Sequence, residues 1–242
     1  MIRQTKAKIF LAEDRGLNET NHFRSLHTFN FGNYFNEHKT SFNDIYVVND
    51  DTLDGGRSLS MLVQEPSYVL LLPVVGAINY KDSQGNENLV AAGQVHIIYA
   101  AKGVTISINN PFKEYLVNFL QVWIKTGALT AAANAYLNSY FVNKKIDKLV
   151  NISPCNINEP ALPFIASIGK FNGRGETTYQ LQYKKSGLFV FVLEGAFEVE
   201  GRLLHARDGL AVWETKAVEM EALSNDAIIL LIETTSNQHH LQ

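Results

Sequence analysis

Histidine is the residue of this chain best suited to bind a metal ion or to transfer a proton near neutral pH. His96 lies in a segment expected to form a strand, where it could be a functional group at a cavity or a hydrogen-bonded core residue. The chain has five internal histidines: His22, His27, His38, His96 and His205. None of them forms a His-x-His or His-x-Glu pair on an expected strand. The two terminal ones, His239 and His240, are too few to predict a metal site.

Two carboxylates, Glu219 and Glu221, are spaced to share one face of a strand, and paired carboxylates can perform acid–base chemistry. The apolar residues Val218, Met220 and Ala222 alternate with them. We therefore expect both acids to point to solvent.

The single cysteine, Cys155, has no histidine within thirty residues of it in the sequence. A catalytic thiol needs a base, so we expect Cys155 to be inert. One cysteine also precludes a disulfide within the chain, so an oxidising compartment is not required. We predict no catalytic residue with a defined role.

Short segments rich in β-branched and aromatic residues recur along the chain, bounded by Gly, Asn, Asp or Pro, and predict strands. The first set is Ile45–Asn49, Tyr68–Val75, Ala77–Tyr80, Gln94–Ala100, Val104–Ile108 and Leu116–Ile124. The second set is Thr178–Tyr183, Leu188–Leu193, Ala196–Val199, Leu210–Trp213, Ala217–Ala222 and Ala227–Glu233. This pattern indicates an all-β chain of barrels or sandwiches.

The two sets share one order of elements, in which a strand is followed by a glycine corner, a strand, a turn, a glycine and a strand. The corner is Gly76 in the first set and Gly195 in the second. We predict tandem barrels at 1–126 and 164–242, joined by a connection at 127–163. Strong helix formers at Ala128–Leu137 predict a short helix in this connection.

The composition excludes some classes of protein. The chain has 242 residues, 46% of them hydrophobic, which is enough for a sizeable core. Its net charge of -3, with a pI near 6.2, argues against nucleic-acid binding. No run of about 18 apolar residues predicts a membrane span, and the N-terminus lacks the apolar region of a signal peptide. We expect a cytoplasmic protein without a membrane or nucleic-acid partner.

Several motifs, taken in order, give the chain a resemblance to the pirin family of bicupins, that is, two tandem cupin (double-stranded β-helix or jelly-roll) barrels. They cover nearly the whole chain: Ser25–Phe35, Val48–Asp51, Asp82–Asn86, Gln121–Ile124 and Asp208–Trp213. The resemblance implies a fold of this kind. It also implies one iron-type ion in the N-terminal barrel of metal-bearing members, held by three His and one Glu. Some of those members are flavonol dioxygenases of the quercetinase type, and others are nuclear co-regulators.

The resemblance also indicates where those ligands should be. A His-Pro-His segment, placed from the anchors Asp82–Asn86 and Gly76, falls on Leu62-Val63-Gln64, so its two histidines become Leu62 and Gln64. A Gly-x-x-His-x-Glu pattern starts at Gly103, so its ligands become Ile106 and Ile108. All four ligand types are missing. The resemblance therefore predicts a degenerate metal site and no metal cofactor.

Alternation of residue types agrees with this reading. Ile106 and Ile108 alternate with Thr105 and Ser107, so the isoleucines share a face that should point into the barrel. Isoleucine has no lone pair with which to bind an ion, whereas iron or nickel is bound by imidazole and carboxylate. Burial of each isoleucine would stabilise the fold by roughly 1.5–3 kcal/mol.

We therefore expect a metal-free pirin-like bicupin that acts by binding a small hydrophobic ligand or a protein partner. The pocket candidates are Leu62, Gln64, Tyr68, His96, Ile106 and Ile108. Two enzymatic alternatives stay open: a quercetinase-type dioxygenase with an altered metal site, and a metal-independent cupin enzyme that uses His96. The sequence favours binding over catalysis.

Overall fold

The computed structural model describes residues 4–126, 135–140, 142–154 and 162–235. Strands make up most of them, and the only helical turns among these residues are the 3₁₀ turns η1 (Ala12–Asp14) and η2 (Val142–Lys144). The all-β prediction is therefore confirmed. No helix in the described part of the chain is long and apolar enough to span a membrane.

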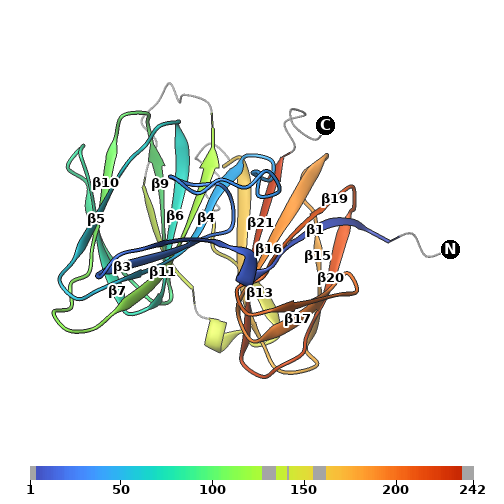
Figure 1. Ribbon diagram of the computed structural model, residues 1–242. Coiled ribbons are helices and arrows are strands. Elements are labelled where there is room, and N and C mark those ends of the chain that lie inside the picture. The colour runs from blue at the N-terminus through green and yellow to red at the C-terminus, as the bar shows by residue number, and fades with distance from the viewer. Residues whose placement is uncertain (1–3, 127–134, 141, 155–161, 236–242) are drawn as a thin grey trace. The chain divides into compact units, whose positions relative to one another are not determined.

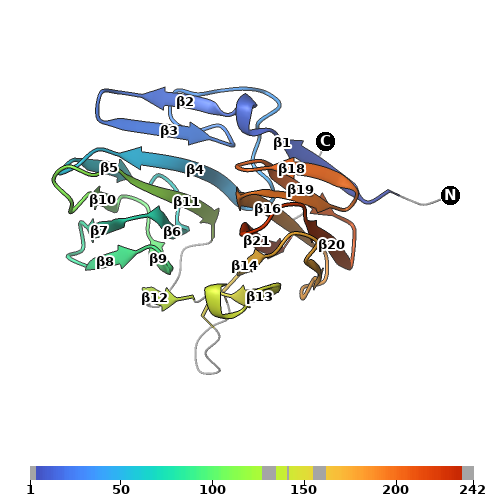
Figure 2. The same cartoon turned by 90° about the horizontal axis from the view of Figure 1, so that it is seen from below.

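The chain forms two compact units, which we call the N-terminal and the C-terminal barrel. The N-terminal barrel comprises residues 16–41 and 45–140. The C-terminal barrel comprises residues up to 15, residues 42–44 and the residues from 141 onward. Figures 1 and 2 show each barrel as two groups of strands.

The larger sheet of the N-terminal barrel has the strand order β12-β9-β6-β11-β4-β3-β2, and the smaller has the order β5-β10-β7-β8. All ladders given for these strands are antiparallel. The bounds are β2 (Gly16–Glu19), β3 (Phe23–His27), β4 (Ile45–Leu53), β5 (Ser58–Leu62), β6 (Ser67–Val75), β7 (Ala77–Asp82), β8 (Glu87–Ala91), β9 (Gln94–Ala100), β10 (Thr105–Asn109), β11 (Val117–Lys125) and β12 (Tyr136–Ser139).

The C-terminal barrel repeats this plan, with sheets ordered β1-β19-β16-β21-β14-β13 and β15-β20-β17-β18. The bounds are β1 (Lys6–Phe10), β13 (Lys148–Asn151), β14 (Phe164–Phe171), β15 (Glu176–Gln180), β16 (Ser186–Glu194), β17 (Ala196–Val199), β18 (Arg202–His205), β19 (Gly209–Trp213), β20 (Ala217–Ala222) and β21 (Ala227–Thr235). The glycine corners of the two barrels correspond, since Gly76 and Gly195 both have positive φ, +81° and +76°, which glycine adopts at little cost.

The two barrels do not divide the chain at one point. Strand β1 pairs antiparallel with β19, from Lys6 opposite Trp213 to Phe10 opposite Gly209. The start of the chain therefore completes a sheet of the C-terminal barrel, whereas the predicted boundary placed the whole of 1–126 in the N-terminal one.

All twelve predicted strands are present, with ends that differ by a few residues. The predicted helix is wrong at its end, because Tyr136 and Leu137 lie in β12, where Leu137 pairs with His96. Backbone pairing with a sheet edge overrides helix propensity there. The rest of that segment, 128–134, lies outside the described residues, as do Cys155, His239 and His240.

A cluster of buried apolar side chains lies between the two sheets of the N-terminal barrel. It includes Val47, Leu53, Val69, Phe119 and Trp123 from the larger sheet. The smaller sheet contributes Ile78, Tyr80, Ile106 and Ile108 to the same cluster. These residues define the inner face of each strand, because side chains two apart on a strand share a face.

Candidate functional site

The isoleucines of β10 lie in the interior of the N-terminal barrel. Ile106 and Ile108 have no exposed surface, whereas Thr105 and Ser107 are partly exposed. Both isoleucines belong to the apolar cluster. The inward orientation predicted for this pair is therefore the observed one.

The other predicted pair, Leu62 and Gln64, is exposed: Leu62 lies on the outer face of β5 in the smaller sheet, and Gln64 lies just beyond the end of that strand. Leu62 is 60% exposed and pairs with Thr105. Met61 pairs with Ile106 and, like the fully buried Val63, packs in the apolar cluster. The inward positions of this segment are therefore Met61 and Val63, and Leu62 and Gln64 cannot line the interior.

The ladder between β5 and β10 explains the misplaced pair. Leu62 pairs with Thr105, whereas Met61 pairs with the inward-facing Ile106. Directly paired residues share a face. A count from a glycine corner beyond another strand therefore cannot determine which residues of β5 face inward.

The residues present do not fit the metal centre that the resemblance implies. Met61, Val63, Ile106 and Ile108 share the interior and offer one thioether and three hydrocarbon side chains, whereas iron-type ions in proteins prefer imidazole and carboxylate donors. Among the described residues, no group of three or more His, Cys, Asp or Glu could hold a metal ion.

Two further pocket candidates, Tyr68 and His96, occupy opposite faces of the larger sheet. Tyr68 pairs with Tyr99, on the face away from Val69, and the two rings lie 5.8 Å apart. Burial raises the pKa of Tyr68. Because it faces away from the interior, Tyr68 is not a neighbour of Ile106.

His96 does face the interior, opposite Leu71, and is fully buried. Its Nδ1 lies 3.1 Å from the carbonyl oxygen of Tyr136, and its Nε2 lies 3.5 Å from the side-chain amide nitrogen of Asn88. These contacts fit an imidazole that donates from Nδ1 and accepts at Nε2. Burial lowers the pKa of His96, although the Tyr136 carbonyl and Asp82 oppose this shift. Both ring nitrogens have partners, which favours the core-residue reading.

A polar row lies beside His96 on the same inner face. His27 in β3 pairs with Asn49 in β4, which pairs with Gln121 in β11. Gln121 pairs with Leu71, the residue opposite His96. Directly paired residues of an antiparallel sheet share a face, so this row crosses five strands on the inner side. Figure 2 shows β3 and β4 side by side.

Asp51 lies next to this row on β4, two residues from Asn49. It is fully buried, and Gln121 donates its side-chain amide to the Oδ2 atom of Asp51. Trp123 donates to the Oε1 atom of Gln121 at 3.1 Å. Burial raises the pKa of Asp51 to about 7, and the repulsion of Asp50 adds to this, while hydrogen bonds from Ser25 and Gln121 oppose it. Asp51 can therefore change protonation near neutral pH.

His27, Asn49, Asp51 and Gln121 are not among the pocket candidates predicted from the sequence. A signal was available, because Asn49 and Asp51 lie between the core residues Val47 and Leu53 at a spacing of two. Residues two apart on a strand share a face. Polar residues at the inward positions of a buried strand indicate a polar site inside the barrel.

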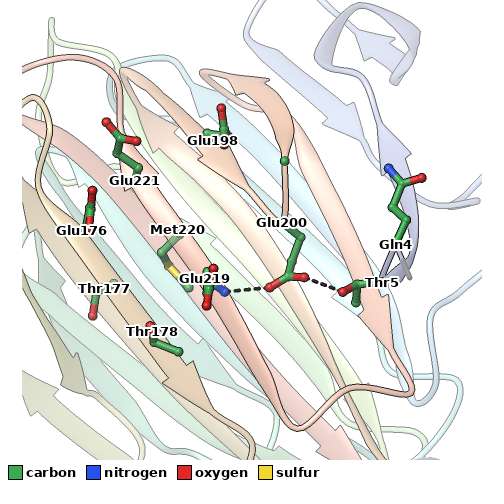
Figure 3. Close-up of a pocket in the computed structure, with 11 residues that line it drawn as sticks. Gln4, Thr5, Glu176, Thr177, Thr178, Glu198, Glu200, Glu219, Met220 and Glu221 are labelled. Atoms are coloured by element: carbon green, nitrogen blue, oxygen red, sulfur yellow. Dashed lines mark hydrogen bonds between the residues drawn. The ribbon is translucent and has the colours of Figure 1, made fainter. Parts of the chain in front are cut away.

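A second candidate site is a groove of about 800 Å³ on the C-terminal barrel, shown in Figure 3. It runs over β15, β17 and β20 and is bordered by Gln4 and Thr5. Five glutamates line it: Glu176, Glu198, Glu200, Glu219 and Glu221. Val218, Met220 and Ala222 are buried on the opposite face of β20, as their alternation predicted.

Like charges oppose one another in this groove. Glu221 pairs with Glu176 on one neighbouring strand and with Glu198 on the other, an arrangement that destabilises a sheet. Arg174 offsets part of it through an ion pair with Glu221 at 2.7 Å. Glu200 accepts a hydrogen bond from Thr5 and one from the backbone nitrogen of Glu219 (Figure 3). The groove would therefore attract cations.

Comparison with known families gives two matches in the chain. The model of the family described as Pirin matches residues 11–124. The model of the quercetinase C-terminal cupin domain matches residues 165–234. Together they cover both barrels.

Relatives of known name have low sequence identity but extend over most of the chain. The quercetin 2,3-dioxygenase of Escherichia coli (strain K12) is 24% identical over 223 residues, which cover 90% of this chain and 95% of the relative. A pirin-like protein of Caulobacter vibrioides is 25% identical over 213 residues, which cover 86% and 91%.

The fold is also that of solved structures. The bacterial pirin YhhW of Escherichia coli in complex with nickel(II) matches with a TM-score of 0.84 and 21% identity, over 96% of this chain and all of that one. A quercetin 2,3-dioxygenase of Acinetobacter baumannii matches with a TM-score of 0.72 and 14% identity, over 99% and 89%. At these identities the structures establish the fold alone.

Proposed function

Because the chain belongs to the pirin family, we propose that it is a pirin-family bicupin that acts by binding a small molecule in its N-terminal barrel, without a metal ion. The observation that carries this proposal is the buried pair Ile106 and Ile108, at the positions to which the family resemblance assigns a histidine and a glutamate. Hydrocarbon side chains cannot replace those ligands.

The inward positions opposite these isoleucines support the same proposal. Met61 lies directly opposite Ile106, and Val63 is fully buried. A thioether is a soft ligand that suits copper(I) better than iron(II) or nickel(II). A metal-dependent reaction would therefore need a different ligand set from the one that the resemblance implies.

Elemental analysis tests the absence of a metal ion. The protein is purified without chelators, incubated anaerobically with Fe(II) or Ni(II), and desalted beside the bacterial pirin YhhW of Escherichia coli, which has been solved in complex with nickel(II), as a metal-binding control. We expect metal far below one equivalent. A stoichiometric metal ion would contradict the proposal.

A second candidate function is that of the relative itself, quercetin 2,3-dioxygenase activity with an altered metal site. It is favoured by the extent of that relative's match, 90% of this chain. Oxygen uptake with quercetin, measured on the metal-incubated protein, distinguishes the two candidates. We expect no uptake above that of the free metal ion.

A further inference from the structure

Three polar side chains are buried together on the inner face of the N-terminal barrel. His27 is 2% exposed, Asn49 is 1% exposed and Asp51 has no exposed surface. His27 and Asn49 are directly paired across β3 and β4, so their Cβ atoms lie about 5 Å apart. Asp51 follows two residues later on the same face.

Five atoms of these residues have no hydrogen-bond partner among the described residues. They are Nδ1 and Nε2 of His27, Nδ2 and Oδ1 of Asn49, and Oδ1 of Asp51. Gln121 differs, since its amide nitrogen donates to Asp51 and its oxygen accepts from Trp123. Folded proteins rarely leave buried polar groups unpaired, because the lost hydration is not replaced. Several such atoms on one interior face therefore indicate a binding site.

The protonation states of these residues indicate what kind of group would fit. Burial lowers the pKa of His27, which keeps its imidazole neutral near neutral pH. Burial also raises the pKa of Asp51 to about 7. A charged ligand would be desolvated here without a fixed counter-charge, so an uncharged group is favoured.

The donors and acceptors narrow the ligand further. The side-chain amide of Asn49 both donates and accepts, and a neutral imidazole does the same through its two nitrogens. A carboxamide group also has both functions and can pair with each of them. Val47, Leu53 and Phe119 are core residues on the same inner face, so the remainder of the ligand should be apolar.

We propose that His27, Asn49 and Asp51 form a binding site for an uncharged carboxamide-type group carried by a small apolar molecule. This inference rests on the proposed binding function and names its site and ligand class. His27 and Asn49 bind the polar group, and Asp51, oriented by Gln121, supplies a third contact through Oδ1. The contacts of His27 with Phe31 and Tyr34, at 5.2 and 6.2 Å between ring centroids, hold its imidazole in place.

Titration with benzamide, followed by NMR of the intact protein near neutral pH, tests this site. Benzamide has a carboxamide on an apolar ring. Toluene lacks the polar group and benzoate carries a charge, so they are the matched controls. We expect benzamide to bind, with toluene and benzoate at least about tenfold weaker, the effect of losing about 1.4 kcal/mol.

Two variants locate the binding. Asn49→Leu and His27→Phe replace the polar atoms by apolar groups of similar shape. Each should weaken benzamide binding about tenfold or more without lowering the melting temperature, because the atoms removed have no partners in the fold. Asn110→Leu is the control, since Asn110 is equally buried but bonds to Leu53, Tyr115 and Phe112. It should lower the melting temperature.

Three results would overturn the inference. One is that benzamide does not bind the wild-type protein. Another is that it binds both variants as well as the wild type, which would place it elsewhere and leave the proposed function intact. The third is that Asn49→Leu lowers the melting temperature as Asn110→Leu does, which would show that internal hydrogen bonds satisfy Asn49. Failure of the proposed function is a separate result, namely a stoichiometric metal ion by elemental analysis.

Discussion

Ile106 lies directly opposite Met61 in the ladder between β10 and β5, and both side chains pack in the interior of the N-terminal barrel. This pairing places Met61 on the inner face of β5 and Leu62 on the outer one. Just beyond the strand, Val63 is buried and Gln64 is exposed. This arrangement determines which substitutions could bring metal ligands together.

The first prediction concerns a restored metal site. The combined variant Met61→His, Val63→His, Ile106→His and Ile108→Glu places four ligands on the inner face, so it should bind Ni(II) and unfold at a higher temperature when Ni(II) is present. The measurement is the melting temperature with and without the metal ion.

A variant with the same four introduced residues, three His and one Glu, is the control for this experiment. It combines Leu62→His and Gln64→His with the same two changes in β10, so that half of its ligands point outward. A larger nickel-dependent rise in this control would contradict the observed register.

The second prediction concerns pH. The pKa of Asp51 is raised from 3.8 to about 7, so between these values the native state keeps a proton that the unfolded state has lost. This contribution to the free energy of unfolding is fully present below pH 4 and is lost as the pH rises through about 7. Asp51→Asn is neutral at every pH, so its stability relative to wild type should rise in this window, by at most about 1.4 kcal/mol per pH unit.

Urea unfolding at a series of pH values measures this difference. Asp54→Asn is the control, because the backbone nitrogen of Gly55 and the side chain of His22 lower the pKa of Asp54. Its effect should therefore be confined to acidic pH. A pH-independent difference between Asp51→Asn and wild type would refute the prediction.

The third prediction concerns Glu233, which is fully buried in the C-terminal barrel. Its carboxylate accepts hydrogen bonds from the hydroxyls of Tyr179 and Ser186 and from the backbone nitrogens of Gln182 and Tyr183. Glu233→Ala leaves these donors without their acceptor, so it should lower the free energy of unfolding by about 3–5 kcal/mol. Chemical denaturation provides the measurement.

Tyr179→Phe is the matched variant, since it removes one of these donors and keeps the ring. It should cost about 1 kcal/mol. Equal losses for Tyr179→Phe and Glu233→Ala would show that the carboxylate is not the centre of this network.

The fourth prediction concerns the acidic groove. Glu198 pairs directly with Glu221, so Glu198→Gln relieves a like-charge contact. The variant should be more stable by up to about 1 kcal/mol at low ionic strength. The gain should shrink in high salt, because exposed charges are screened. Unfolding at two salt concentrations tests this, and a gain that does not depend on salt would exclude an electrostatic origin.

Much of the fold could be predicted from local patterns. Gln94–Ala100, Ala196–Val199 and Ala217–Ala222 have the predicted bounds, because their β-branched and aromatic residues lie between clear turn residues. Strand β1 was not predicted. Its five residues, Lys6–Phe10, include two lysines, and the pairing that makes them a strand lies some 200 residues away, with β19.

The candidate site could be predicted only in part. Alternation alone places Ile106 and Ile108 on one face, since both lie within a regular strand. The face of Leu62 depends on the register of β5 against β10, which residue types do not reveal. The polar row of His27, Asn49 and Gln121 depends on the order β3-β4-β11, which only the assembled sheet defines.

The pairing of β1 with β19 has a consequence for the order of events during synthesis. Strand β1, Lys6–Phe10, leaves the ribosome some 200 residues before its partner β19, Gly209–Trp213. The N-terminal barrel comprises residues 16–140 apart from the short segment 42–44. It can be translated and folded before β19, the partner of β1, has been synthesised. Such a non-local ladder closes late and slowly, so a stalled or truncated chain exposes β1 as an unpaired strand edge, a template for intermolecular pairing.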